Sequence, residues 1–171
     1  MLTKNILFKN FQSKKRLQTI ENIFLDIKKK FYKKSDPFLN SLTNLYKNSF
    51  NNNSLKNLKK FKEYNVIGMG GSVLGAKAIY CFLEDYMKKK FNFTDNIKIK
   101  KIPNTKKNLN LIISKSGNTL ETIVNFNTLQ RNNNSIFLTE NTNNSLRNIA
   151  AKLESELFEH KNFIGGRYSV L

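Results

Sequence analysis

The sequence predicts an α/β fold in which an N-terminal helical segment precedes a doubly wound, mainly parallel sheet with helices on both faces. Two observations support this fold class. Apolar residues recur at helical spacing before residue 62, and short apolar runs alternate with stretches of helical period from residue 64 onward. We therefore expect a helical segment at residues 1–62 and an α/β domain at residues 63–171.

The first segment is expected to form short helices. Apolar side chains at steps of three and four predict a helix over residues 20–31. An Asp-Pro pair at 36–37 begins a second helical stretch, and the asparagine-rich residues 51–54 are typical of a loop. A third short helix is expected over residues 55–61. The second stretch has its apolar edge at Leu39, Leu42 and Leu45.

The α/β domain is expected to alternate strands with helices. Ser145 is expected to cap the last helix, and Cys81 is expected as a small buried residue of the first one. In such folds ligands bind at the carboxyl ends of the parallel strands. The expected strands are residues 64–67, 97–102, 109–113, 135–139 and 156–159, and the expected helices are residues 72–90, 119–131 and 145–153.

Composition excludes several classes of protein. The 171 residues include one Cys and one His, which excludes a disulfide framework, a Cys-based zinc ribbon and a His/Cys metal cluster. No apolar run approaches the roughly 20 residues of a membrane span, and the first residues lack the features of a cleaved signal. We expect a cytoplasmic protein without a membrane partner.

The net charge of +18 has two explanations. A strongly basic domain suggests a surface for nucleic acid. The alternative is codon composition, because Lys, Asn, Ile and Phe all have A- and T-rich codons and Asn is as inflated as Lys. Nucleic-acid binding gives no reason for the excess of Asn, so we favour the compositional explanation and expect no nucleic-acid partner.

A glycine-rich segment, residues 68–75 (GMGGSVLG), follows the first strand of this domain. Its glycines would let the backbone approach an anion at a helix N-terminus. It is not a dinucleotide fingerprint, because Val73 occupies a required glycine position, and it is not a P-loop, because residues 76–78 (AKA) replace G-K-[ST]. A tight strand-to-helix turn remains the alternative.

A second segment, residues 114–122 (SKSGNTLET), carries hydroxyls around a glycine where a strand meets a helix. Hydroxyls, successive backbone N–H groups and the positive end of a helix dipole together suit a phosphate dianion. The alternative is ordinary N-capping by Ser116 or Thr119. Because the segment lies at the same sheet edge as the first, the phosphate interpretation is favoured.

A third segment, residues 165–169 (GGRYS), places an arginine after two glycines. Arg167 could offer a fixed cationic fork to an oxyanion or a phosphate, and the alternative is a turn with a surface arginine. His160 has no identified carboxylate partner, so we expect a structural or surface histidine.

In this order the three segments resemble the signatures of the glucose-6-phosphate isomerase (phosphoglucose isomerase) family, within residues 64–171. The resemblance implies a sugar-phosphate-binding α/β domain of the sugar-isomerase (SIS) type and reversible isomerisation of glucose 6-phosphate and fructose 6-phosphate through an enediolate. It also implies a cytoplasmic homodimer that uses no metal or organic cofactor. The implied phosphate site is Ser114, Lys115, Ser116 and Thr119, the sugar site is lined by Gly71 and Ser72, and Arg167 stabilises the enediolate.

Two departures qualify the resemblance. In this family the catalytic glutamate, a ring-opening histidine and a further lysine follow the Gly-Gly-Arg element, and here only four residues follow Arg167. We therefore expect an inactive N-terminal fragment that binds phosphosugar, with a complete, non-catalytic sugar-phosphate-binding regulatory module as the alternative. Asn118 also stands where a small or hydroxyl residue is expected.

Overall fold

The computed structural model describes residues 18–33, 36–41, 43–44, 46–50, 52–97, 107–129 and 134–165. The chain forms two compact units, residues 1–46 and residues 47–171. The division into domains that the sequence suggests, between residues 62 and 63, stays a prediction.

The first unit contains helices α1 (Gln18–Lys33) and α2 (Pro37–Ser41). The helix expected over residues 20–31 is confirmed. Its charges complement the helix dipole, with Glu21 in the first turn and lysines in the last. Asp36 starts α2, because its Oδ1 accepts hydrogen bonds from the backbone N–H groups of Phe38 and Leu39, at 2.8 and 3.2 Å. Leu42 and Leu45 lie outside the described residues.

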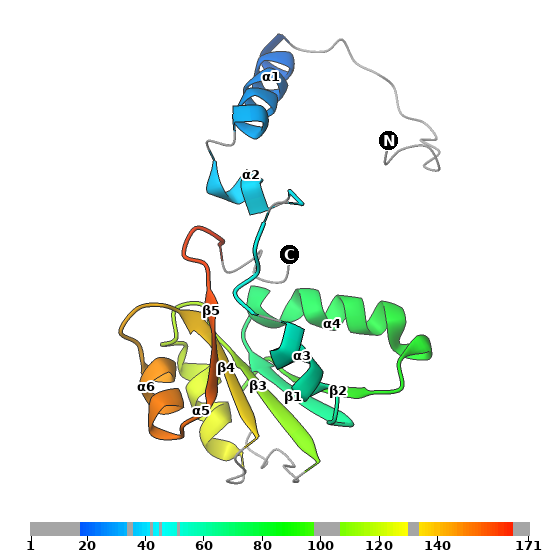
Figure 1. Ribbon diagram of the computed structural model, residues 1–171, viewed down its shortest axis with the longest axis vertical. Coiled ribbons are helices and arrows are strands. Elements are labelled where there is room, and N and C mark those ends of the chain that lie inside the picture. The colour runs from blue at the N-terminus through cyan, green and yellow to red at the C-terminus, as the bar shows by residue number, and fades with distance from the viewer. Residues whose placement is uncertain are drawn as a thin grey trace. The chain divides into compact units, whose positions relative to one another are not determined.

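The second unit is built on a parallel sheet with strand order β2-β1-β3-β4-β5. Figure 1 shows α5 and α6 together beside this sheet. This arrangement confirms the α/β fold class. Its strands are β1 (Glu63–Gly68), β2 (Lys90–Thr94), β3 (Asn108–Ile113), β4 (Ser135–Glu140) and β5 (Glu156–His160); its helices are α3 (Asn52–Leu58), α4 (Gly71–Leu83), the 3₁₀ turn η1 (Glu84–Tyr86), α5 (Leu120–Thr128) and α6 (Ser145–Lys152).

Each face of the sheet buries its own apolar cluster. Side chains alternate between faces along a strand, so Leu109 and Ile112 of β3 belong to different clusters. The first cluster lies on the face that α3 covers, and the second lies beneath α5 and α6. Buried members of the first are Phe61, Tyr64, Leu109 and Ile136, and those of the second are Ile112, Phe137, Leu146 and Ala150.

Polar side chains form a row across the face beneath α5. Asn65 on β1 donates from Nδ2 to Oδ1 of Asn110 on β3 at 2.9 Å, and its own Oδ1 accepts from Nδ2 of Asn92 on β2 at 3.2 Å. Asn110 continues the row to Oγ of Ser135 on β4 at 3.5 Å. The strand register places these four residues side by side, which is why the amides can pair. We call this set the amide row.

The helix expected over residues 72–90 is wrong in its second half. Helix α4 ends at Leu83, and residues 90–94 form strand β2 at the sheet edge. The alternation of Phe91 and Phe93 is a strand pattern, and the Phe91 ring stacks on that of Tyr64 with centroids 4.6 Å apart. Of the strand expected over residues 97–102, Ile97 lies outside any strand and the rest lies outside the described residues.

Three smaller expectations are also wrong. The loop expected at residues 51–54 is replaced from Asn52 onward by α3. Asn144, not Ser145, caps α6, because an asparagine directly precedes the serine and its side chain accepts from the N–H of Arg147. Cys81 is exposed rather than buried, as are Phe82 and Leu83, because the last turn of α4 is not covered.

The remaining expected elements are confirmed within the described residues. Strands β1, β3, β4 and β5 and helices α5 and α6 match the expected ranges to within a few residues at each end. In the part of the chain that the structure describes, no helix combines the length and apolarity needed to cross a bilayer.

Candidate functional site

The candidate site lies at the carboxyl edge of the sheet, where three strand-to-helix connections come together. Strands β1 and β3 are neighbours, and Gly68 pairs with Ile113 at their last residues. The glycine-rich turn after β1 and residues 114–119 after β3 therefore begin side by side. We call residues 114–119 the anion loop, after the phosphate site that the sequence predicts there.

The glycines of the first turn are required by packing and by backbone conformation. A Cβ on Gly68 would lie 2.7 Å from Cγ2 of Val73 and 2.8 Å from the carbonyl oxygen of Ile113, so only glycine lets α4 start this close to β3. Gly70 has a φ of +54°. Gly71 and Ser72 form the first turn of α4, where Ser72 is buried and its N–H donates to the Met69 carbonyl at 3.2 Å. Their predicted role in lining a sugar site stays a prediction.

The anion loop is closed by hydrogen bonds between its own ends. The hydroxyls of Ser114 and Thr119 lie 2.8 Å apart, and Ser114 Oγ also accepts from the N–H of Gly117 at 3.1 Å. Ser116 is exposed, and its Oγ accepts from the N–H of Asn118 at 3.3 Å. The fold thus brings Ser114 and Thr119 together as a pair and leaves Ser116 at the surface of the loop.

Two helices begin beside this loop, and only one is capped by side chains. Thr119 is the N-cap residue of α5 but makes no capping hydrogen bond, so the alternative that Ser116 or Thr119 simply caps this helix is wrong. In contrast, α6 receives acceptors from the loop: Ser145 N–H donates to Asn118 Oδ1 at 2.9 Å, and Leu146 N–H donates to the Gly117 carbonyl at 3.0 Å. The side chain of Thr119 therefore does not accept a hydrogen bond from the first N–H groups of α5.

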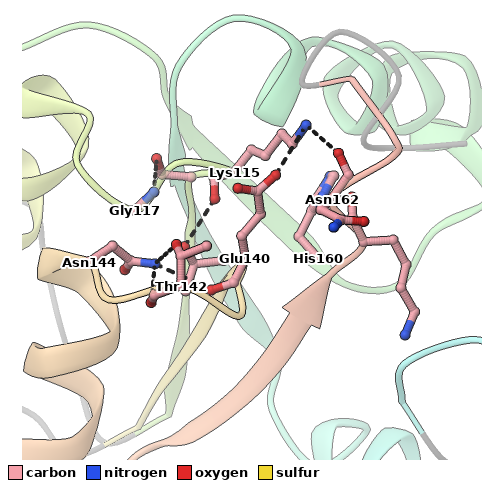
Figure 2. Close-up of polar contacts among 10 residues, drawn as sticks. Lys115, Gly117, Glu140, Thr142, Asn144, His160 and Asn162 are labelled. Carbon is pink, nitrogen blue, oxygen red and sulfur yellow. Dashed lines mark hydrogen bonds and ion pairs between the residues drawn. The ribbon is translucent and has the colours of Figure 1, made fainter.

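The side chain of Lys115 points out of the loop toward β4 and β5, as Figure 2 shows. Its Nζ lies 3.1 Å from Oε1 of Glu140 and donates to the carbonyl of Asn162 at 2.9 Å. The ammonium of Lys115 is thus held by a carboxylate and a backbone carbonyl.

His160 ends β5 next to this ion pair and is buried, with 6% of its surface exposed. Burial lowers the pKa of His160, and the positive charge of Lys115 lowers it further. The hydrogen bond to the Lys161 carbonyl and the carboxylate of Glu140 act in the opposite direction. The net effect favours the neutral form of the histidine, and its Nδ1 lies 2.9 Å from the Lys161 carbonyl oxygen to which it donates. Its structural role agrees with the interpretation drawn from the sequence.

One predicted site residue lies outside the described residues, and two residues that the structure brings to the site were not predicted from the sequence. Arg167 lies outside the described residues, so its predicted catalytic role is neither placed nor tested. Sequence reasoning missed Glu140 as the partner of Lys115, since no local pattern joins residues on adjacent strands. It missed Asn144 as a cap although asparagine before a helical stretch is a recognised capping signal. Within the described ranges, no three His, Cys, Asp or Glu residues are grouped as metal ligands.

Comparison with known families decides the affiliation of the chain. The family model for phosphoglucose isomerase matches residues 39–171, which is most of the sequence. The chain belongs to the phosphoglucose isomerase family. The resemblance drawn from the three sequence segments is thereby confirmed.

Curated members of the phosphoglucose isomerase family are similar to this chain but much longer. The glucose-6-phosphate isomerase of Methanocaldococcus jannaschii is 34% identical, over 67% of this chain and 33% of the relative. That of Borrelia garinii subsp. bavariensis is 37% identical, over 66% of this chain and 25% of the relative. The chain therefore spans a third or less of the length of these relatives.

Solved structures support the fold assignment. A hypothetical protein from Thermus thermophilus matches with a TM-score of 0.58 and 23% identity, covering 67% of this chain and 31% of that protein. The Vibrio vulnificus NanR protein complexed with ManNAc-6P matches with a TM-score of 0.52 and 16% identity, covering 85% and 55%. At these identities the likeness shows a shared fold.

Proposed function

We propose that this chain is the phosphate-binding part of an enzyme that interconverts glucose 6-phosphate and fructose 6-phosphate. Family membership supports the reaction class, because the curated relatives are named glucose-6-phosphate isomerase. The proposal includes a cytoplasmic homodimer at the length of those relatives. In it, the chain binds the phosphate of the sugar, and the proton-transferring groups come from other parts of the enzyme.

The observation that carries the proposal is the start of α5, which Thr119 does not cap and which lies beside the paired hydroxyls of Ser114 and Thr119. A phosphate dianion there would accept hydrogen bonds from the first N–H groups of the helix and from Ser114, Ser116 and Thr119. The positive end of the helix dipole adds favourable electrostatics. The neighbouring helix α6 is fully supplied with acceptors, so it does not compete for the ligand.

The chemistry proposed for the sugar follows from this placement. A phosphate bound at α5 would extend the sugar toward the glycine-rich turn, where Gly71 and Ser72 would line its path. Arg167 would stabilise the enediolate formed while a proton moves between C1 and C2. A fixed cation aimed at charge that develops in the transition state lowers the barrier of the chemical step.

Binding to the purified 171-residue chain tests the phosphate site. Calorimetric titration should show that fructose 6-phosphate and inorganic phosphate bind and that fructose does not. Thr119→Val, which removes a hydroxyl at nearly constant volume, should weaken binding about tenfold or more, since a hydrogen bond to a charged group is worth roughly 1.5–3 kcal/mol. Thr128→Val, at the other end of α5, is the matched control. Equal affinity for fructose and its phosphate would refute the proposal.

Activity tests the isomerase assignment separately. Alone, the chain should not turn over fructose 6-phosphate, because it lacks a proton-transferring base in the family's position. A chimera in which this chain replaces the matched third of the Methanocaldococcus jannaschii relative should isomerise it, and Arg167→Ala should abolish most of that activity. An inactive but well-folded chimera that still binds phosphosugar would contradict the proposed reaction.

The second candidate function is a non-catalytic module that senses sugar phosphates. The fold it shares with NanR, a protein solved in complex with ManNAc-6P, favours this alternative. Phosphosugar binding by the chain together with an inactive chimera would support it.

A further inference from the structure

Lys115 joins the anion loop to a turn that the proposed phosphate site does not include. Its backbone belongs to the loop, while its ammonium donates to the carbonyl of Asn162 at 2.9 Å. The two residues are 47 positions apart in the sequence and are brought together only because β3, β4 and β5 end at the same edge (Figure 2). Residues 161–164, which follow β5, form this turn.

The backbone carbonyl of Lys115 is hydrogen-bonded as well as its side chain. Its carbonyl accepts from the N–H of Glu140 at 3.0 Å and from Oγ1 of Thr139 at 3.1 Å. Glu140 thus contacts the lysine twice, through its amide and through its carboxylate. The backbone carbonyl and the ammonium of Lys115 are therefore both bonded to Glu140 at the end of β4.

The turn itself is closed at its other end by the histidine. The Lys161 carbonyl accepts from Nδ1 of His160 at 2.9 Å and from the N–H of Ile164 at 3.2 Å. Ile164 is buried, which anchors the end of the turn in the unit. The polypeptide continues from there through Gly165, and Arg167 is three residues beyond Ile164 in the sequence.

We propose that Lys115 is a positioning residue that couples anion binding in the loop 114–119 to the ordering of the turn 161–164. Anion binding would reduce the motion of the Lys115 backbone, and the ion pair with Glu140 and the hydrogen bond to Asn162 would carry this restriction to the turn. In the proposed isomerase this turn precedes the segment with Arg167 in the sequence, so the coupling would link phosphate binding to the turn that leads to the arginine. The inference rests on the proposed function, because it requires an anion in the loop.

Hydrogen exchange of the Ile164 amide measures this coupling directly. In the unmodified chain, fructose 6-phosphate at ten times its Kd should slow exchange of this amide by up to about tenfold, the mass-action limit for a locally open state that does not bind ligand. In Lys115→Met the same degree of saturation should leave the exchange rate nearly unchanged. Without ligand, the Ile164 amide should already exchange faster in Lys115→Met than in the unmodified chain.

Three further variants and one reference amide distinguish this coupling from a general loss of stability. Lys115→Arg should restore the slowing, because it keeps a cation near Glu140, whereas Glu140→Gln should reduce it while leaving Lys115 in place. Lys152→Met removes an exposed lysine of α6 and should change nothing. The amide of Leu153, which donates to the Ile149 carbonyl within the end of α6, should exchange alike in all variants.

The outcomes separate this inference from the proposed function. If the unmodified chain binds no phosphosugar or phosphate, the proposed function fails and the inference fails with it. If it binds them and Ile164 slows equally in the unmodified chain and in Lys115→Met, the inference is wrong and the proposed phosphate site stands. Binding with no effect on Ile164 in the unmodified chain would likewise overturn the inference alone.

Discussion

Gly117 is the residue of the anion loop whose substitution is expected to cost most. Its φ is +68°, and a Cβ there would collide with Oδ1 of Asn144 and approach Oγ1 of Thr139 to 2.7 Å. Gly117→Ala should therefore lower the free energy of unfolding by about 2–4 kcal/mol, from backbone strain together with displacement of a capping side chain. Urea denaturation measures this change. Gly70→Ala is the control for backbone strain without a collision, because Gly70 has a φ of +54° and a ψ of −126° but no atom within 4 Å of its Cβ, and it should cost about 1–3 kcal/mol.

His160 predicts a pH dependence of stability. Its pKa is lower in the folded protein than the ordinary value of 6.5, because it is buried, so the unfolded chain binds the proton more readily. The free energy of unfolding should accordingly fall as the pH drops below about 6.5 and level off, for this group, below the folded pKa. Denaturation between about pH 5 and 7.5 should show this slope in the unmodified chain and a smaller one in His160→Gln. A slope that is the same in both proteins would show that other groups are responsible.

Among the elements, α6 depends on the loop of another strand for its first hydrogen bonds. Asn118 Oδ1 accepts from the N–H of Ser145 across 27 residues of sequence. Asn118→Ala should destabilise the protein by about 1 kcal/mol, as for the loss of a helix cap, and Asn118→Asp should preserve stability because it keeps the acceptor and places a negative charge at the helix start. Asn148→Ala, an exposed position within α6, is the control. Thermal or urea unfolding of the three variants measures the difference.

The sheet depends on the amide row in a cooperative way. Asn65→Leu should cost about 2 kcal/mol or more, because it removes a donor from Asn110 and an acceptor from Asn92 in a buried site. Asn65→Leu combined with Asn110→Leu should lower the free energy of unfolding by less than the sum of the two single substitutions. Each single variant leaves one amide without its partner, whereas the double variant removes both amides. A double-mutant cycle by urea denaturation checks this expectation, and additive costs would contradict it.

At the scale of the whole molecule, α4 and the turn after it expose a large apolar surface. Phe82 is 84% exposed and Tyr86 is 87% exposed, and Leu74 and Ile79 are also more than half exposed. Such a surface favours association, so sedimentation should show concentration-dependent self-association or aggregation of the 171-residue chain. Phe82→Ser should reduce that association and leave phosphate affinity unchanged, because Phe82 lies near the C-terminal end of α4, whereas the anion loop lies beside the turn that precedes this helix. If the unmodified chain and Phe82→Ser associate equally, another surface is responsible for the association.

The sequence predicted those features whose interacting residues are neighbours in the chain, and it missed features that depend on contacts between distant residues. Strands β1, β3 and β4 follow from short apolar runs, and the anion loop follows from residues 114–122, because a strand, a hydroxyl-rich turn and a helix are adjacent in the chain. Strand β2 was missed because the alternation of Phe91 and Phe93 is too short to indicate a strand by itself, and only the pairing with β1 shows it. Cys81 was misjudged for a similar reason: its sequence position does not reveal that the last turn of α4 is not covered.

The residues alone were therefore enough for the fold class, the family resemblance and the position of the anion loop. These depend on periodicity and on motifs in which the interacting groups are neighbours in sequence. The absence of side-chain capping at α5, the Lys115–Glu140 pair and the support of α6 by Asn118 depend on contacts between distant residues. Such contacts exist only once the parallel strands bring their carboxyl ends to one edge, because strand order and register, rather than sequence separation, set which side chains meet there.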